Sequence, residues 1–145
     1  MNRATPPLRD IASRIILHES ERSRSLESGS PAELQIPERL RPHLTTLMGI
    51  GGYRALLMRS LALASPEIPW MRSVKVSVDG FVEGFLPQVE TLSSREIQEG
   101  RVELGAQLIG LLVAFIGEKL TLQLLTEVWP ELADTNLNIT PKDRK

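Results

Sequence analysis

Three carboxylates form the most regular set of side chains that could carry out chemistry. Glu96, Glu99 and Glu103 are spaced i, i+3 and i+7, so a helix would place them on one face. Paired carboxylates can act as general acid and base or bind a divalent cation. The same residues lie near an expected helix start, where negative charge is favourable. We therefore interpret them as a solvated helix face, with a metal-dependent enzyme as the weaker alternative.

The other reactive side chains are few. His18 precedes Glu19 but lacks the second histidine of a HExxH zinc site, and His43 is remote in sequence. Cysteine is absent, which excludes disulfides, thiolate chemistry and cysteine-ligated zinc. The stretch GIGG at 49–52 lacks the lysine of a phosphate-binding loop, so a tight turn between helices is expected. The sequence thus predicts no catalytic residue, no metal and no cofactor.

The composition narrows the class of partner and the compartment. The chain has 145 residues, of which 41% are hydrophobic and 24% charged, as in an ordinary globular domain. A formal net charge of -1 and an aromatic content of 4% argue against binding to nucleic acid, which favours basic stripes interleaved with aromatics. The first residues lack the continuous apolar core of a secretory signal. We expect a soluble cytoplasmic protein that binds no nucleic acid.

The elements that would position any site are expected to surround residues 104–117, LGAQLIGLLVAFIG. This stretch has no charged residue, and a helix that is apolar on all sides must be buried on all sides. At about 1.5 Å per residue its length is about 21 Å, which is shorter than a hydrocarbon core of about 30 Å. It therefore predicts a buried central helix and no membrane span.

Small and large side chains divide this helix into two faces. Ala106, Gly110, Ala114 and Gly117 recur at intervals of four, four and three residues, which forms a stripe of small side chains. The stripe predicts close packing of another helix, from the same chain or from a second copy. The bulky residues of the other face are the candidates for an apolar ligand pocket: Leu108, Leu111, Leu112 and Phe115.

Residues 1–36 are expected to form an N-terminal arm. Within it, residues 8–26 carry apolar side chains at i, i+3, i+4, i+7 and i+8, which is typical of an amphipathic helix. These side chains are Leu8, Ile11, Ala12, Ile15 and Ile16. A Ser-rich linker follows, and its composition favours flexibility. Two interpretations stay open: the helix packs on its own domain, or it docks in a groove of another chain.

Residues 37–130 are expected to form a helical domain, and residues 131–145 a polar C-terminal tail. A long central helix at about 100–129 contains the apolar stretch. A β-hairpin at about 73–85 is inserted between helices, because β-branched residues alternate there before an Asp-Gly turn. The predicted fold class is mainly α, a compact helical bundle around a central buried helix.

Two shorter helices are predicted before the hairpin, on either side of the glycines at 49–52. An interior proline costs about 3 kcal/mol, so the first helix is expected to start near Arg41, with Pro42 in its first turn. The second is predicted at 53–65 and ends before Pro66.

These features favour a protein–protein interaction module without enzymatic activity, acting as an adaptor, regulatory or oligomerisation domain. The N-terminal amphipathic helix would be its docking element. The partner would be another protein or a second copy in a homodimer. A carrier or sensor of a small apolar ligand held between helices is the alternative.

Overall fold

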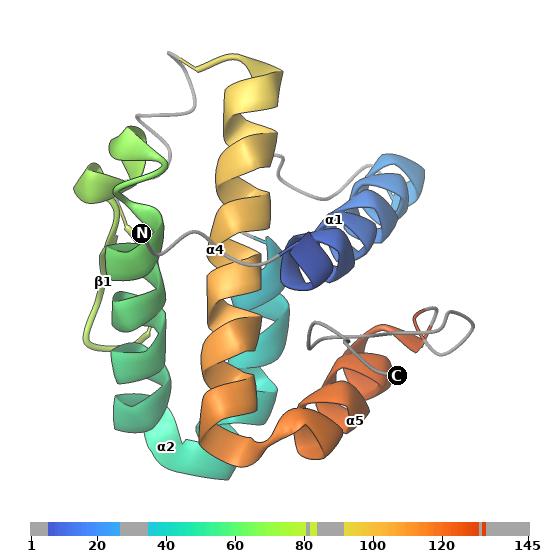
Figure 1. Ribbon diagram of the computed structural model, residues 1–145, viewed down its shortest axis with the longest axis vertical. Helices are drawn as coiled ribbons and strands as arrows, with labels where there is room; N and C mark the ends of the chain where they lie inside the picture. The colour runs from blue at the N-terminus through green and yellow to red at the C-terminus, as the bar shows by residue number, and fades with distance from the viewer. Residues whose placement is uncertain (1–5, 27–34, 81, 84–91, 131, 133–145) are drawn as a thin grey trace.

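The computed structural model describes residues 6–26, 35–80, 82–83, 92–130 and 132. The fold is mainly α, as predicted, with helices packed around a central one and a small hairpin at one side (Figure 1). The four helices of the bundle are α1 (Pro6–Leu26), α2 (Gln35–Ala64), α4 (Ser94–Ile116) and α5 (Glu118–Val128). The predicted linker lies mostly outside the described residues, and so does the predicted tail except for Leu132.

The central helix α4 starts earlier than residue 100. Ser93 caps it: its Oγ accepts from the Glu96 backbone N–H at 3.1 Å, and the Ser93 N–H donates to Glu96 Oε1 at 2.9 Å. This capping box satisfies donors that the first turn would otherwise leave unpaired. Gly100 therefore lies inside the helix, where the Trp70 ring approaches so closely that a Cβ would lie 2.3 Å from Trp70 Cζ2.

The helix predicted at about 100–129 is divided in two at one residue. Gly117 has φ 94° and ψ 157°, and it separates α4 from α5. A positive φ of this kind is strained for residues with a Cβ but open to glycine. The chain turns there, so α5 leaves the axis of α4 and packs at an angle to it (Figure 1).

The long helix α2 contains both of the shorter helices predicted before the hairpin. Gly49, with φ 79° and ψ 162°, kinks α2 between them, as the glycine-rich stretch indicates. The predicted start near Arg41 is wrong, because α2 begins at Gln35 and Pro42 lies inside it. Ile36 and Leu40 are fully buried in the core, and this packing favours helical turns before the proline.

The first strand of the hairpin is shorter than predicted, and residues 81 and 84–85 of the predicted 73–85 lie outside the described residues. Strand β1 (Lys75–Val76) pairs antiparallel with β2 (Val82–Glu83), after a 3-10 turn η1 (Pro69–Ser73). The Arg54 guanidinium of α2 donates from Nε to the Ser77 carbonyl oxygen at 2.6 Å and so holds the hairpin against the helix. A two-stranded hairpin is marginal alone in water, so this attachment matters for its stability.

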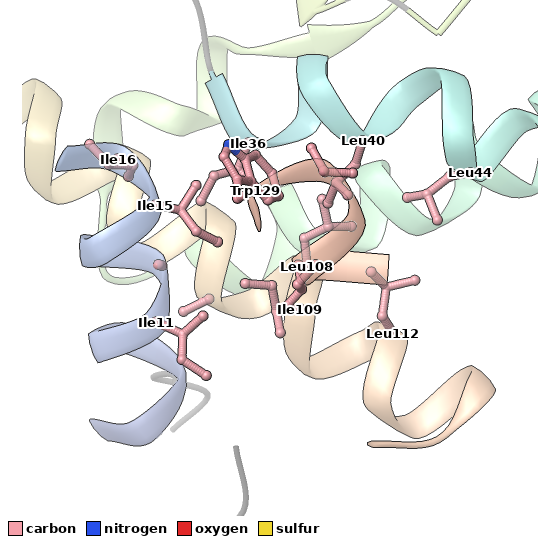
Figure 2. Packing of buried hydrophobic residues seen from close by; sticks show 14 of the residues in the cluster. Ile11, Ile15, Ile16, Ile36, Leu40, Leu44, Leu108, Ile109, Leu112 and Trp129 are labelled. Atoms are coloured by element: carbon pink, nitrogen blue, oxygen red, sulfur yellow. The ribbon is translucent and has the colours of Figure 1, made fainter. Parts of the chain in front are cut away.

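Two clusters of buried side chains fill the bundle. The larger draws residues from all four helices, and Figure 2 shows its centre, where Ile11 and Ile15 of α1 face Leu108 and Ile109 of α4. The smaller joins the second half of α2 and η1 to α4, through Leu61, Ala64, Ile68, Met71, Val74 and Leu104. Full burial of one large aliphatic side chain contributes about 1.5–3 kcal/mol, so these clusters dominate the stability of the fold.

Candidate interaction surface

The apolar face of the N-terminal helix packs within its own chain. Ile11, Ala12, Ile15 and Ile16 are at most 1% exposed, and α1 lies against α4 (Figure 2). Leu8 is half-buried at the start of the same face. Of the two interpretations left open by the sequence, the structure therefore has this helix in cis, where its apolar face is already covered.

A buried ion pair fastens α1 to α4. Glu103 is 0% exposed, and the Arg9 guanidinium donates to its Oε1. The Gln107 side-chain amide donates to the other carboxylate oxygen, Oε2, at 2.9 Å. Buried charges are tolerated when they are paired and hydrogen-bonded in this way. Glu103 is therefore a structural residue that joins segments 94 positions apart.

The interpretation of Glu96, Glu99 and Glu103 as one solvated face is wrong for Glu103. Glu96 and Glu99 are exposed, and Glu96 belongs to the helix cap, whereas Glu103 faces α1. In the described part of the chain, no group of three or more histidine or acidic side chains is placed to hold a metal ion. The signal that separates Glu103 from the other two is its position next to the apolar stretch, with Gln107 one turn later.

The stripe of small residues passes from the core to the surface. Ala106 is buried and Gly110 is half-buried, but Ala114 and Gly117 are exposed. The closest helix contact lies beside the stripe, at Gly105, where a Cβ would lie 2.4 Å from Ile36 Cδ1 and 3.5 Å from the Ala12 Cβ. Sequence reasoning missed Gly105 because its spacing does not fit the four-residue repeat.

Gly110→Leu is expected to lower the free energy of unfolding by about 1–3 kcal/mol, because Leu8 Cδ1 lies 3.1 Å from the position of the missing Cβ. Ala114→Leu is the matched control. It changes an exposed position of the same stripe and should stay within about 0.5 kcal/mol of the wild type. Urea unfolding followed by circular dichroism measures both, and equal values would show that the stripe has no tightly packed end.

The predicted ligand-pocket residues lie apart from the groove described next. Leu108 and Leu112 are fully buried in the core, and Leu111 is half-buried. Phe115 is 67% exposed near the end of α4. None of the four lines the groove described next.

An apolar groove lies between the first half of α2 and α5. Its volume is about 620 Å³, and it opens widely to solvent. Leu47 of α2 and Leu120 of α5 are more than half exposed on its walls. The full lining is Pro42, His43, Thr46, Leu47, Ile116, Leu120, Gln123, Leu124 and Glu127. Leucines exposed on both walls of a groove are a feature of surfaces that bind another molecule.

The groove becomes polar toward the end of α5. Pro42, His43 and Glu127 also border a second hollow of about 350 Å³, which includes Glu38 and Arg39. Arg39 donates from Nη2 to the Val128 carbonyl oxygen at 3.2 Å, and its Cζ lies 6.0 Å from the centre of the Trp129 ring. Arg39 thus holds the end of α5 against α2.

Two glycines determine where the groove forms. The kink of α2 at Gly49 and the turn between α4 and α5 at Gly117 lie at the same end of the bundle (Figure 1). Near these two turns, Ile50 and Phe115 are exposed, in addition to the leucines of the groove. The glycine-rich stretch at 49–52 predicted the first of these turns. The groove itself depends on how α2 and α5 lie relative to each other, which the sequence alone does not give.

The surroundings of Tyr53 change the pKa of its hydroxyl. Burial raises its pKa above the ordinary value of 10.0, the charge of Glu38 raises it further, and Arg41 acts in the opposite direction. Its hydroxyl donates to the Pro37 carbonyl oxygen at 3.1 Å. Tyr53 therefore stays neutral and links the two halves of α2 in the core, which is a structural role.

Comparison of the chain with protein-family models, with curated proteins and with solved structures finds no match. Among the described helices, none combines the length and the hydropathy needed to cross a membrane.

Proposed function

We propose that this chain is a non-enzymatic protein–protein interaction module, and that its partner covers the groove between α2 and α5. The observation that carries the proposal is the exposure of Leu47 and Leu120 on opposite walls of one groove. Exposed apolar side chains gathered in this way are typical of surfaces that bind protein, whereas single exposed ones are ordinary. We place the module in the cytoplasm, since a chain without cysteine suits a reducing compartment.

The shape of the groove favours a helix as the bound element. Its walls are two helices, and Leu120, Leu124 and Glu127 recur along α5 at intervals of four and three. Amphipathic helices bind in such grooves through apolar side chains spaced i, i+3 or i+4 and i+7. The arm does not supply this element in cis, because the apolar face of α1 is buried against α4.

The experiment is site-specific photocrosslinking in the cells that produce the protein. A photoreactive amino acid replaces Leu120 in one variant and Arg59 in the control. Arg59 is exposed on the second half of α2, on the other side of α4 from α5 (Figure 1). We expect a discrete protein adduct at Leu120 and none at Arg59. Equal background at both positions would overturn the proposal.

A carrier of a small apolar ligand is the second candidate, because a volume of about 620 Å³ falls in the range of small-molecule sites. Such sites usually bury most of the ligand surface, whereas this groove opens widely to solvent. Native mass spectrometry of the gently purified protein separates the two candidates. A co-purified apolar molecule that is lost in Leu120→Asp would favour the carrier.

A further inference from the structure

One face of α5 remains exposed, and it carries a regular set of side chains. Its exposed residues are Lys119, Leu120, Gln123 and Glu127. The opposite face, formed by Thr121, Leu125 and Val128, is buried in the bundle. Gln123 lies at the centre of the exposed face, with Lys119 four residues before it and Glu127 four residues after it.

The two charges stand at the ends of α5 that their signs do not favour. A helix stabilises negative charge at its N-terminus and positive charge at its C-terminus. Lys119 lies in the first turn of α5 and Glu127 in the last turn. Neither forms an ion pair with any residue in the part of the chain that the structure describes. Their placement is therefore not explained by the stability of α5 itself.

We propose that a second copy of this chain covers this face, with the two α5 helices antiparallel and a two-fold axis at Gln123. In that arrangement Lys119 of each copy lies opposite Glu127 of the other, about 6 Å along the helix from the axis. Each charge then meets one of opposite sign, and the two Gln123 amides meet at the axis, where each can donate to the other. This proposal rests on the proposed function and names its partner.

The apolar part of the surface fits the same arrangement. Leu120, Gln123 and Glu127 belong to the exposed face of α5 and also line the groove, so a second copy on this face would cover an edge of the groove as well. A two-fold interface requires a surface that is complementary to itself. Here the apolar residues supply contact area, and the opposite charges of Lys119 and Glu127 favour the antiparallel orientation of the two α5 helices. The interface is built around one helix of 11 residues, so we expect a dissociation constant on the order of micromolar.

The test is a charge exchange measured by sedimentation equilibrium of the full chain at low salt. Wild type is expected to be a dimer. Lys119→Glu and Glu127→Lys should each weaken the dimer by about tenfold or more, because each places two pairs of like charges across the axis. The variant with both substitutions should recover to within about threefold of the wild type, since the pairs are restored with their signs exchanged.

We do not expect the weaker dimerisation of the single variants to come from unfolding of the protein. Both substitutions give α5 the charge that its ends favour, so its own stability should not fall. Arg59→Glu is the matched control, a charge reversal on an exposed face of α2 that should leave the dimer unchanged. Circular dichroism confirms that every variant is folded.

A wild-type chain that stays monomeric to about 1 mM would overturn the proposed dimer. So would a dimer that is insensitive to both single substitutions, because its interface would lie on another face. In either case, a crosslink from Leu120 to a different protein would leave the proposed function standing. If the crosslink is also absent, both proposals fail.

Discussion

Arg9→Met is expected to lower the free energy of unfolding by about 3 kcal/mol, because it leaves the buried carboxylate of Glu103 without its cation. The value lies at the lower end of the range for a broken buried pair, since the Arg9 side chain is 25% exposed. Domains of this size are stable by about 5–15 kcal/mol, so the loss is large. Urea unfolding followed by circular dichroism measures it.

The chain provides a matched control on the same helix. Arg14 Nε forms an ion pair with Asp10 Oδ2 at 3.0 Å, and both side chains are largely exposed. Arg14→Met should therefore lower the free energy of unfolding by only about 0.3–0.5 kcal/mol. If Arg9→Met lowers the free energy of unfolding by no more than Arg14→Met does, the buried pair does not hold α1 in place.

A double variant separates the ion pair from the shape of the site. Arg9→Met with Glu103→Leu removes both charges and keeps apolar side chains of similar size, so its stability should recover toward the wild type. A double variant as unstable as Arg9→Met alone would show that the packing of Arg9, and not the unpaired carboxylate, explains the loss. The same variant should keep α1 protected from hydrogen exchange, because the apolar contacts of Ile11 and Ile15 remain.

Local pattern was sufficient to predict that the chain is mainly helical and which faces of α1 and α4 are apolar. The spacing of Ile11, Ile15 and Ile16 indicated an amphipathic helix, and the apolar stretch at 104–117 indicated a central one. Both signals depend on the 3.6-residue period, which acts over neighbouring turns. The capping box between Ser93 and Glu96 is a local pattern of the same kind, since its two residues are three apart.

Contacts between distant segments could not be predicted in this way. Nothing near Arg9 or Glu103 in sequence indicates that they meet, and the spacing of Glu103 from Glu99 suggested a shared solvated face. Burial of Ile36 overrode the helix-breaking tendency of Pro42, because tertiary packing outweighs local propensity. Tertiary packing places both α2 and α5, the two helices that form the walls of the groove.

The glycines indicated where a helix could be interrupted. The sequence did not show which of them lie inside a helix and which end one. Gly105 and Gly110 lie inside α4, whereas Gly117 ends it with a positive φ. The difference comes from what each glycine meets: a Cβ at Gly105 would collide with Ile36, while nothing lies within 4 Å of Gly117. One glycine allows a close contact between helices, and the other allows a turn.

Trp129→Ala is expected to lower the free energy of unfolding by about 4 kcal/mol, because truncation of a buried tryptophan leaves a large cavity. Trp129 is 0% exposed, and it packs in the larger core cluster with residues from all four helices. Its ring also lies under the Arg39 guanidinium, which holds the end of α5. The variant should therefore loosen α5 and the groove as well as the core. Urea unfolding measures the stability, and hydrogen exchange measures the loss of protection in α5.

Trp70→Ala is the control for the size of the side chain. Trp70 is half-buried and packs beside the smaller cluster, so its removal should cost less than that of Trp129 and leave α5 protected. The sequence has two tryptophans, so the fluorescence of each single variant comes from the one tryptophan that remains. Folded Trp70→Ala should emit at a short wavelength, because its remaining indole is excluded from water. If Trp129→Ala costs no more than Trp70→Ala and α5 keeps its protection, then Trp129 does not hold α5 on the bundle.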